Sequence, residues 1–322
     1  MYLLLIFIMP TSCDSDYIMN AKYEDYGVSY ENHLRFKSTA PVFSVFMTFN
    51  DWKDSQSGVI YGDMLLNVLA CDEEDDYEEN AFLWDLNTGK KLGSFNLSHI
   101  LDGSEYYKPH ANEVCFGKKI NDDDLFPLLY ISQSFGLEYG KIEHKKSGVL
   151  VYRIINSDKK YKAELVQVIK PSIEDEVLFN MMGSSIHNYV VDTDNDLLYV
   201  LGYRDNSWFN SNNDILVTIF KLPKLSEGKE LVLTHDMILD NYTIPMSYSM
   251  QSAFYDNGFI YIMNGDAINF KWIRSLNLKS KKIESKLDFS DIAGEPQFCG
   301  YWKGKFLLYF AGDWGNLFEI RE

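Results

Sequence analysis

The sequence predicts an all-β protein, and three observations carry that prediction. A unit consisting of a polar residue, a short strand, a tight turn and a second apolar strand recurs about five times from residue 56 onward. It is clearest in the segments 56–68, 251–263 and 297–309. Aromatic residues make up 15% of the 322 residues, as suits pleated, half-buried strands, and proline is sparse. Repetition at this length predicts a single β-propeller of five four-stranded blades, with six blades as the alternative if residues 17–40 contribute more strands.

The chain begins with an apolar run, residues 2–9, that is too short to span a bilayer. Cys13 follows it closely and precedes a polar stretch, an arrangement that resembles a bacterial lipoprotein signal in which Cys13 becomes lipidated. The chain departs from that pattern because no Lys or Arg precedes the run and because Pro10 replaces the usual Leu. An ordinary secretory signal or a buried N-terminal strand is the alternative. We expect residues 1–19 to be signal and tether, and residues 20–322 to be the propeller, lipid-anchored outside the cytoplasm at the outer membrane or surface of a bacterium.

Within the propeller, each blade is expected to be an antiparallel meander whose innermost strand lines a central channel. The first blade begins at Gln56, the second at His110, the third at Asn188, the fourth at Gln251 and the fifth at Gln297. Apolar patterning and turn residues predict the strands of each blade. The first blade is expected to contain 57–61, 63–70 and two strands within 81–97, and the second 110–116, 126–132, 148–154 and 163–169. The third is expected to contain 188–202 as a hairpin, 215–221 and 230–234, the fourth 251–263 as a hairpin, 272–278 and 282–289, and the fifth 297–302, 305–311 and 316–321.

The fifth blade has three strands in this scheme, which would leave a long exposed edge. The segment 41–49, Pro-Val-Phe-Ser-Val-Phe-Met-Thr-Phe, has no partner elsewhere. We therefore expect this N-terminal segment to supply the missing strand and close the ring.

The net charge of the chain argues against one class of partner. The net charge of −17 argues against a nucleic-acid partner, because phosphate binding needs a Lys/Arg surface, and it suits solubility. The acidic run 72–79 is expected to be a solvated loop. Asp192, Asp194 and Asp196 alternate as in a calcium loop, but the sixth and twelfth positions lack the required Gly and Glu, so we interpret them as a hairpin turn. No metal site and no cofactor are predicted.

The cysteine pattern predicts free thiols and offers no metal-ligand spacing. Apart from Cys13, the chain has Cys71, Cys115 and Cys299, with no close pair and no Cys-x-x-Cys spacing. Each lies in or beside an apolar strand, so buried free thiols are expected.

The residues that open the inner strands are all polar, and they are the candidate ligand-binding residues: Gln56, His110, Asn188, Gln251, Gln297 and, close to the last, Glu295. They should converge near one mouth of the channel, where amides and an imidazole could bind hydroxyl groups. Alternatively, they satisfy backbone groups at the strand ends and line a water-filled channel.

Catalysis is less well supported. Glycoside hydrolysis requires two carboxyl groups at a fixed separation, whereas this mouth offers one, Glu295. Glu295 and His110 are weak acid–base candidates, while Glu113 lies further along its strand and points away from His110. No nucleophile elbow, phosphate-binding loop, dinucleotide fingerprint or His-Glu-x-x-His motif occurs, so the sequence favours a protein that is not an enzyme.

Four segments and the leader ending in Cys13 also carry a family resemblance, namely 56–63, 110–113, 126–132 and 295–297. With these, the chain resembles uncharacterised β-propeller lipoproteins of gut Bacteroidetes over about residues 41–321. The resemblance implies a cell-envelope or surface location and a role near glycan uptake, and it brings no catalytic residues.

These observations lead to one expected function and two alternatives. We expect an extracytoplasmic binding module that recognises a carbohydrate or other small polar ligand at the channel mouth. The alternatives are a polysaccharide hydrolase or lyase, and a protein–protein interaction scaffold with an envelope protein partner. In each case contact with the membrane is expected only through the lipid anchor.

Overall fold

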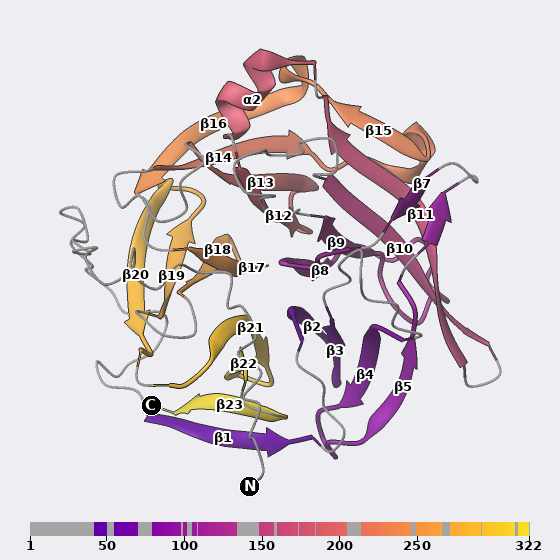
Figure 1. Cartoon of the computed structure of the whole chain (residues 1–322), viewed down its shortest axis with the longest axis vertical. Coiled ribbons are helices and arrows are strands. Elements are labelled where there is room, and N and C mark those ends of the chain that lie inside the picture. The colour runs from indigo at the N-terminus through magenta and orange to yellow at the C-terminus, as the bar shows by residue number, and fades with distance from the viewer. Residues whose placement is uncertain are drawn as a thin grey trace, which may run out of the picture.

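The computed structural model is an all-β ring of sheets around a central axis (Figure 1). It describes residues 42–49, 55–69, 79–97, 99–101, 105–107, 109–133, 148–157, 160–172, 174–183, 185–204, 214–245, 249–265, 271–290, 292–312 and 315–321. Five blades, each built on four antiparallel strands, follow one another around the axis. The predicted five-bladed propeller is confirmed, and the six-bladed alternative is wrong.

Four of the blades take their four antiparallel strands in chain order, with no strand from the other end of the chain. The first contains β2 (Ser57–Tyr61), β3 (Met64–Val68), β4 (Ala81–Asp85) and β5 (Lys91–Phe95); the second β8 (Val114–Phe116), β9 (Leu129–Gln133), β10 (Gly148–Ser157) and β11 (Lys160–Pro171); the third β12 (Ser185–Asp192), β13 (Leu197–Tyr203), β14 (Asp214–Lys221) and β16 (Ile238–Pro245); the fourth β17 (Met250–Asp256), β18 (Phe259–Asn264), β19 (Trp272–Asn277) and β20 (Lys282–Asp288).

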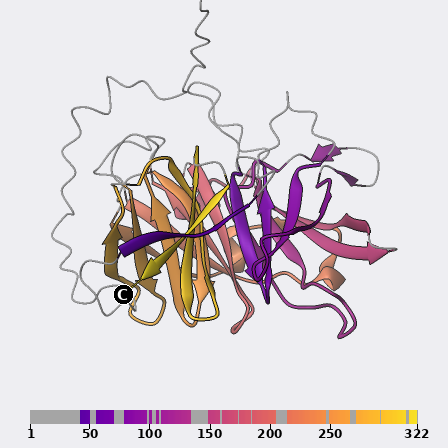
Figure 2. The ribbon, with the colours of Figure 1, turned by 90° about the horizontal axis from the view of Figure 1, so that it is seen from below.

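The fifth blade joins the two ends of the described chain. It contains β21 (Glu295–Trp302), β22 (Lys305–Ala311) and β23 (Asn316–Arg321), and β1 (Val42–Thr48) pairs antiparallel with β23 on its outer side. Figure 2 shows β1 lying across the outside of the ring beside β23. Strand β1 therefore covers the edge that β23 would otherwise expose, and the predicted closure of the ring by an N-terminal strand is confirmed.

The fourth strand of the third blade differs from the prediction. Residues 230–234 were expected there, but β15 (Glu230–Leu233) pairs in parallel with β11 and so extends the second blade. The buried Gln167 side chain on β11 holds the connection, because its Nε2 donates to the backbone oxygens of Lys224 (3.0 Å) and Gly228 (2.8 Å). Strand β11 is twelve residues long and would otherwise present an open edge, which β15 covers.

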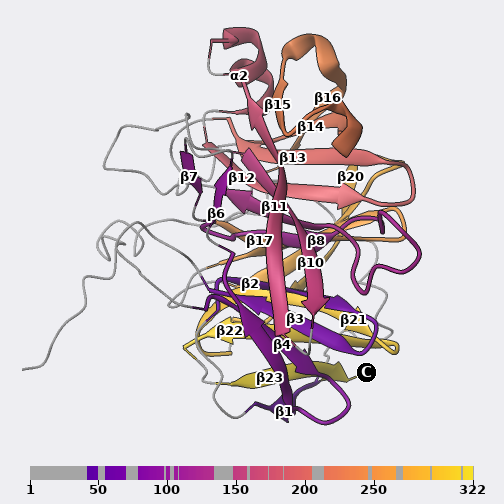
Figure 3. The ribbon, with the colours of Figure 1, turned by 90° about the vertical axis from the view of Figure 1, so that its right-hand side faces the viewer.

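A short helix, α2 (Glu176–Met182), precedes the third blade and was not predicted. The Asp175 carboxylate caps it by accepting from the backbone N–H of Leu178 (3.0 Å), and Leu178 and Met182 are buried against the propeller. Asp175 before the segment and Gly183 after it are the sequence signals that could have identified this helix. Figure 3 shows α2, β15 and β16 together at the opposite end of the molecule from β1 and β23.

The hydrophobic core lies between neighbouring blades. Facing apolar sides of adjacent sheets bury large residues, among them Trp84, Tyr152, Tyr261 and Phe310. The innermost strands contact one another around the axis: β2 contacts β8 and β21, β12 contacts β8 and β17, and β17 contacts β21. This packing holds five strand edges around one narrow channel. Within the described part of the chain, no helix has the length and apolar character needed to cross a membrane.

Candidate functional site

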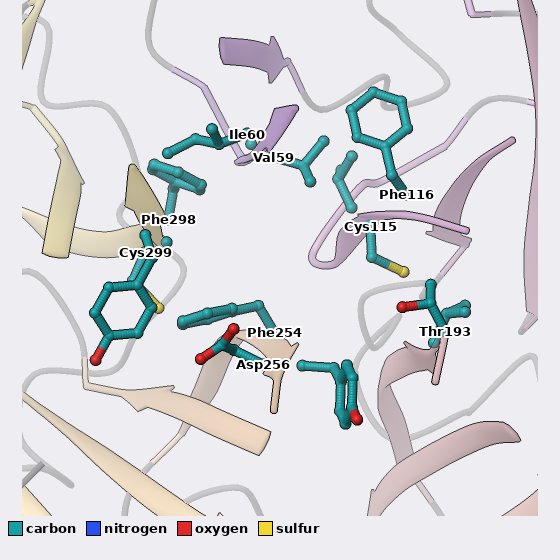
Figure 4. Close-up of a pocket in the computed structure, with 15 residues that line it drawn as sticks. Val59, Ile60, Cys115, Phe116, Thr193, Phe254, Asp256, Phe298 and Cys299 are labelled. Carbon is teal, nitrogen blue, oxygen red and sulfur yellow. The ribbon is translucent and has the colours of Figure 1, made fainter. Parts of the chain in front are cut away.

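A cavity of ≈ 230 Å³ lies in the channel, and all five blades contribute to its wall. One lining residue from each blade, in chain order, is Val59, Phe116, Thr193, Asp256 and Tyr301. These residues lie in or just after the second half of the innermost strands, beside the first hairpin turn of each blade. Figure 4 shows Val59, Phe116, Thr193 and Asp256 distributed around the opening.

The aromatic ring of Phe254 forms part of the wall beside Asp256 (Figure 4). One face of this ring is stacked on Tyr261, with 4.8 Å between centroids and 16° between planes. The Tyr301 ring lies in a T-shaped arrangement with Phe254, with 6.1 Å between centroids and 63° between planes. Because Tyr261 covers one face of the Phe254 ring, the opposite face is the one that can meet a ligand.

Phe298 completes the apolar wall, and two glycines make room for it. A Cβ atom added to Gly300 would lie 3.2 Å from Phe298 Cζ, and one added to Gly58 would lie 3.3 Å from Phe298 Cδ2. At Gly58 the added atom would also lie 3.0 Å from the backbone oxygen of Leu66. Glycine at both positions therefore allows β2 and β21 to approach each other around the Phe298 ring.

The polar part of the wall is acidic. Asp256 is the one carboxylate among the described lining residues, and no Lys, Arg or His is among them. Tyr255 is another lining residue, and its hydroxyl donates to Asp194 Oδ2 at 2.6 Å. Burial, followed by this hydrogen bond, raises the pKa of Tyr255 above its usual range, so it stays a neutral donor. Asp194 thereby adds a second negative charge near the cavity.

A buried carboxyl group, Glu113, lies two residues before Cys115, which lines the cavity. Its Oε2 accepts hydrogen bonds from the backbone N–H of Ala253 and from Asn188 Nδ2 (3.3 Å), and its Oε1 has no partner among the described residues. Burial raises the pKa of Glu113 to about 8 and outweighs the hydrogen bonds, which lower it. The group is therefore largely a neutral acid at pH 7.

None of the six predicted ligand-binding residues lines the cavity. Gln56 and His110 precede β2 and β8, Gln251, Glu295 and Gln297 lie within the first three residues of β17 or β21, and Asn188 is the fourth residue of β12. Glu295 brings two of them together, since its Oε1 accepts from Gln251 Nε2 (2.5 Å) and its Oε2 from Gln297 Nε2 (3.0 Å). Gln251 Nε2 also donates to the backbone oxygen of Gly265 at 3.0 Å. Gln251, Gln297 and Glu295 therefore form one cluster between the fourth and fifth blades.

The other three predicted residues have different surroundings. Gln56 Nε2 donates to Asn112 Oδ1 at 3.0 Å, which links the first and second blades. Asn188 is fully buried and contacts Glu113. His110 is half-buried just ahead of the second blade. Cys13, the predicted lipidation site, lies outside the described residues, as do Cys71 and most of the acidic run.

Sequence reasoning did not single out the residues that line the cavity as a ligand site. It aligned the repeats by their polar starts, whereas the cavity lies at the ends of the same strands. Aligning the residues before each first turn would have placed Phe254, Asp256 and Tyr301 near one another. That signal was present, because aromatic residues and a carboxylate precede these turns in the fourth and fifth repeats.

Several of the titratable side chains near the channel are hydrogen-bonded or buried. Both oxygens of Glu295 accept from side-chain amides, which keeps the carboxylate in place as a hydrogen-bond acceptor. Cys115 and Cys299 are buried free thiols, as predicted, and burial raises the pKa of both, which disfavours the reactive thiolate. Among the described residues, no group of three or more His, Cys, Asp or Glu side chains is placed to hold a metal ion.

The fold and the cavity define this chain as a β-propeller with a small channel site. No protein-family model and no curated protein matches the sequence. Similar solved structures include a Thermus thermophilus protein named as an oxidoreductase of the glucose dehydrogenase type (7% identity, 87% of this chain and 100% of that one, TM-score 0.47). Myxococcus xanthus glutaminyl cyclase is similar at 10% identity over 87% of this chain and 96% of that one, with a TM-score of 0.45. Similarity at this level does not extend to function.

Proposed function

We propose that this protein is a binding module that takes a small ligand, a carbohydrate unit or another small polar molecule, into the propeller channel. The observation that carries the proposal is the ≈ 230 Å³ cavity to which all five blades contribute. Pockets for drug-sized ligands typically measure about 300–1,000 Å³, so the expected ligand is of monosaccharide size or smaller. The composition of the wall agrees, because apolar and aromatic surface is combined with a few polar groups such as Thr193 and Asp256.

The cluster of Gln251, Gln297 and Glu295 is proposed as a second contact region at the other mouth of the channel, together with Gln56, His110 and Asn188. Its amide and carboxylate groups already bind one another, which supports a prearranged polar surface. A ligand that reached both halves of the channel would have to pass Glu113. Changing Gln251 to Ala should weaken the binding of such a ligand, whereas a ligand confined to the cavity should bind unchanged.

The lipid anchor and the envelope location also remain proposals, supported by the leader sequence and by the resemblance to propeller lipoproteins. Metabolic labelling with a fatty acid tests them directly. Label is expected in the wild-type protein expressed in a bacterial host and should be absent from the Cys13→Ala variant. Unlabelled wild-type protein that is released in soluble form would contradict the anchor.

Thermal unfolding with a ligand panel tests the binding function. The panel should contain monosaccharides, short glycans, small amines and amino acids. A ligand at a hundred times its dissociation constant stabilises the folded state by roughly 2.7 kcal/mol, which should raise Tm by a few degrees in a chain of this size. The Thr193→Trp variant places bulk at the cavity and should abolish the shift. Ser157→Trp places the same bulk at an exposed strand end and should not.

A shift that survives Thr193→Trp would place the ligand elsewhere. The absence of any shift across the panel would count against the binding function.

A further inference from the structure

The charged side chains named in and beside the cavity wall are negative. Asp256 contributes a carboxylate to its wall, the described lining residues contribute no cationic side chain, and Asp194 lies within hydrogen-bond reach of the lining residue Tyr255. The protein as a whole carries a net charge of −17. An acidic cleft of this kind raises the local concentration of cations and repels anions.

The aromatic part of the cavity wall also favours a positively charged ligand. Tyr261 covers one face of the Phe254 ring, so the ring presents its other face toward the cavity, and Asp256 lies beside it (Figure 4). An aromatic face carries partial negative charge and attracts an ammonium group that lies over it. The carboxylate and the ring can therefore stabilise the same positive charge.

The wall is poorly suited to an inorganic cation. Calcium takes six to eight oxygen ligands and magnesium requires octahedral coordination, whereas most of the described lining side chains are hydrocarbon, aromatic or thiol groups. A cation that carries its own apolar groups has no such requirement. Its carbon atoms can contact Val59, Phe298 and Phe254 while its nitrogen faces Asp256.

From these observations we infer that the cavity binds a small organic cation, a primary to quaternary ammonium compound of monosaccharide size or smaller, with Asp256 as its counter-ion. The inference rests on the proposed binding function and specifies its ligand class. Phe254 supplies the aromatic surface over which the ammonium group lies.

Calorimetric titration of the full chain with a matched pair of probes tests this inference. Choline and 3,3-dimethylbutan-1-ol have nearly the same shape, but only choline is charged, and glucose serves as a neutral sugar of similar size. Choline should bind at least tenfold more tightly than its neutral counterpart. Raising the salt concentration should weaken choline binding alone, because screening acts on the charge.

Three variants test which residues cause the preference for choline over its neutral counterpart. Asp256→Asn should weaken choline binding at least tenfold and change the binding of the neutral probe less than threefold. Phe254→Leu should weaken choline binding several-fold. Asp123→Asn removes one negative charge from an exposed turn and should leave the binding of all probes unchanged. Thermal unfolding of each variant verifies that it is folded.

The outcomes separate the inference from the proposed function. Equal binding of choline and its neutral counterpart, or choline binding unaffected by Asp256→Asn, overturns the organic-cation inference and leaves the binding function in place. Preferential binding of glucose has the same meaning. If none of the three probes binds, the inference is overturned, and the broader ligand panel then decides the binding function separately.

Discussion

The carboxyl group of Glu113, at the start of the second blade's innermost strand, accepts a hydrogen bond from the backbone N–H of Ala253, on the innermost strand of the fourth blade. These two blades are not neighbours in the ring, so the Glu113 side chain reaches across the channel. Asn188 of the third blade donates to the same oxygen. One buried carboxyl group therefore connects three blades at the axis.

This connection predicts a pH dependence of stability. The pKa of Glu113 is about 8 in the folded protein against an ordinary value of 4.5, so between these values the folded state holds a proton that the unfolded chain releases. The contribution of this group to the free energy of unfolding should therefore be largest below about pH 4.5. It should fall as pH rises from there through about 8, by on the order of a few kcal/mol in total. Urea unfolding at a series of pH values measures the effect.

The Glu113→Gln variant provides the control for that series. Glutamine keeps an acceptor for Ala253 but carries no titratable proton, so the pH dependence between about 5 and 8 should flatten. The Glu113→Ala variant leaves the Ala253 N–H without this acceptor and should be less stable than the wild type by roughly 1–3 kcal/mol below about pH 4.5, where the carboxyl group is neutral. This deficit should shrink as pH rises, because only the wild type is then destabilised by a buried charge. Identical pH profiles for the wild type and Glu113→Gln would show that Glu113 titrates normally.

Because β1 closes the ring, substitutions that remove its buried contacts should lower the stability of the protein. Phe46 on β1 packs against Trp302 of β21, with 5.4 Å between ring centroids. Phe46→Ala should lower the free energy of unfolding by about 2 kcal/mol, because a partly buried ring is lost from the contact that closes the propeller. Val45→Ala on the same strand is the control: the Val45 side chain is 49% exposed, and its loss should change stability by less than about 0.5 kcal/mol. Equal effects of the two substitutions in chemical denaturation would contradict this role for Phe46.

The turn after β12 should depend on Asp192 and be indifferent to calcium. Asp192 is fully buried, and its Oδ1 accepts from the backbone N–H groups of Asp194 (2.9 Å) and Asn195 (3.0 Å). Asp192→Ala leaves these donors unpaired and should lower stability by about 1–3 kcal/mol. Calcium should not raise Tm in either protein; a rise in the wild type that is lost in Asp192→Ala would indicate a calcium loop instead.

The matched control at this turn is Asp196→Asn. Asp196 has a φ of 56°, a conformation that asparagine adopts readily. Its ion pair with Lys118 lies between side chains that are about half exposed, so its loss should cost less than about 1 kcal/mol.

The buried thiols predict slow alkylation. Burial raises the pKa of Cys115 and Cys299, and the nearby Glu113 carboxylate raises both further. Iodoacetamide should therefore modify these two residues at least about tenfold more slowly in the folded protein than in urea, as peptide mapping by mass spectrometry can measure. Modification of Cys299 at the rate of a free thiol would show that solvent reaches it from the cavity.

The fold could be predicted from sequence because the residue patterns that specify it are local and repeated. Apolar strands and turn residues recur in each blade, and the fifth blade's shortage of one strand matched the unpaired segment 41–49. The assignment of 230–234 was wrong because strand pairing depends on which edge is open nearby. Periodicity identified a strand there, but only the length of β11 made its edge the partner of β15.

The ligand-binding role of the six strand-start residues stays a prediction, while the structure shows how some of them meet. The polar starts of the innermost strands do meet, at Gln251, Gln297 and Glu295. Glu113 was set aside because strand alternation directs it away from His110. In the structure the strand begins only at Val114, and Ala111 has a φ of 65°, so residues 110–113 do not alternate as a strand. The Glu113 carboxyl group instead reaches the backbone N–H of Ala253. Sequence patterning gives neither the true start of a strand nor a contact with a strand two blades away.

The sequence by itself determined that the chain forms a propeller of five blades and that β1 closes it, since strand periodicity, turns and the count of strands are properties of the chain read in order. The tertiary structure alone decided where the cavity lies and which residues face it. Those depend on how tightly five strand edges pack around the axis, and on contacts such as that of Glu113 with Ala253, which lies 140 residues further along the chain.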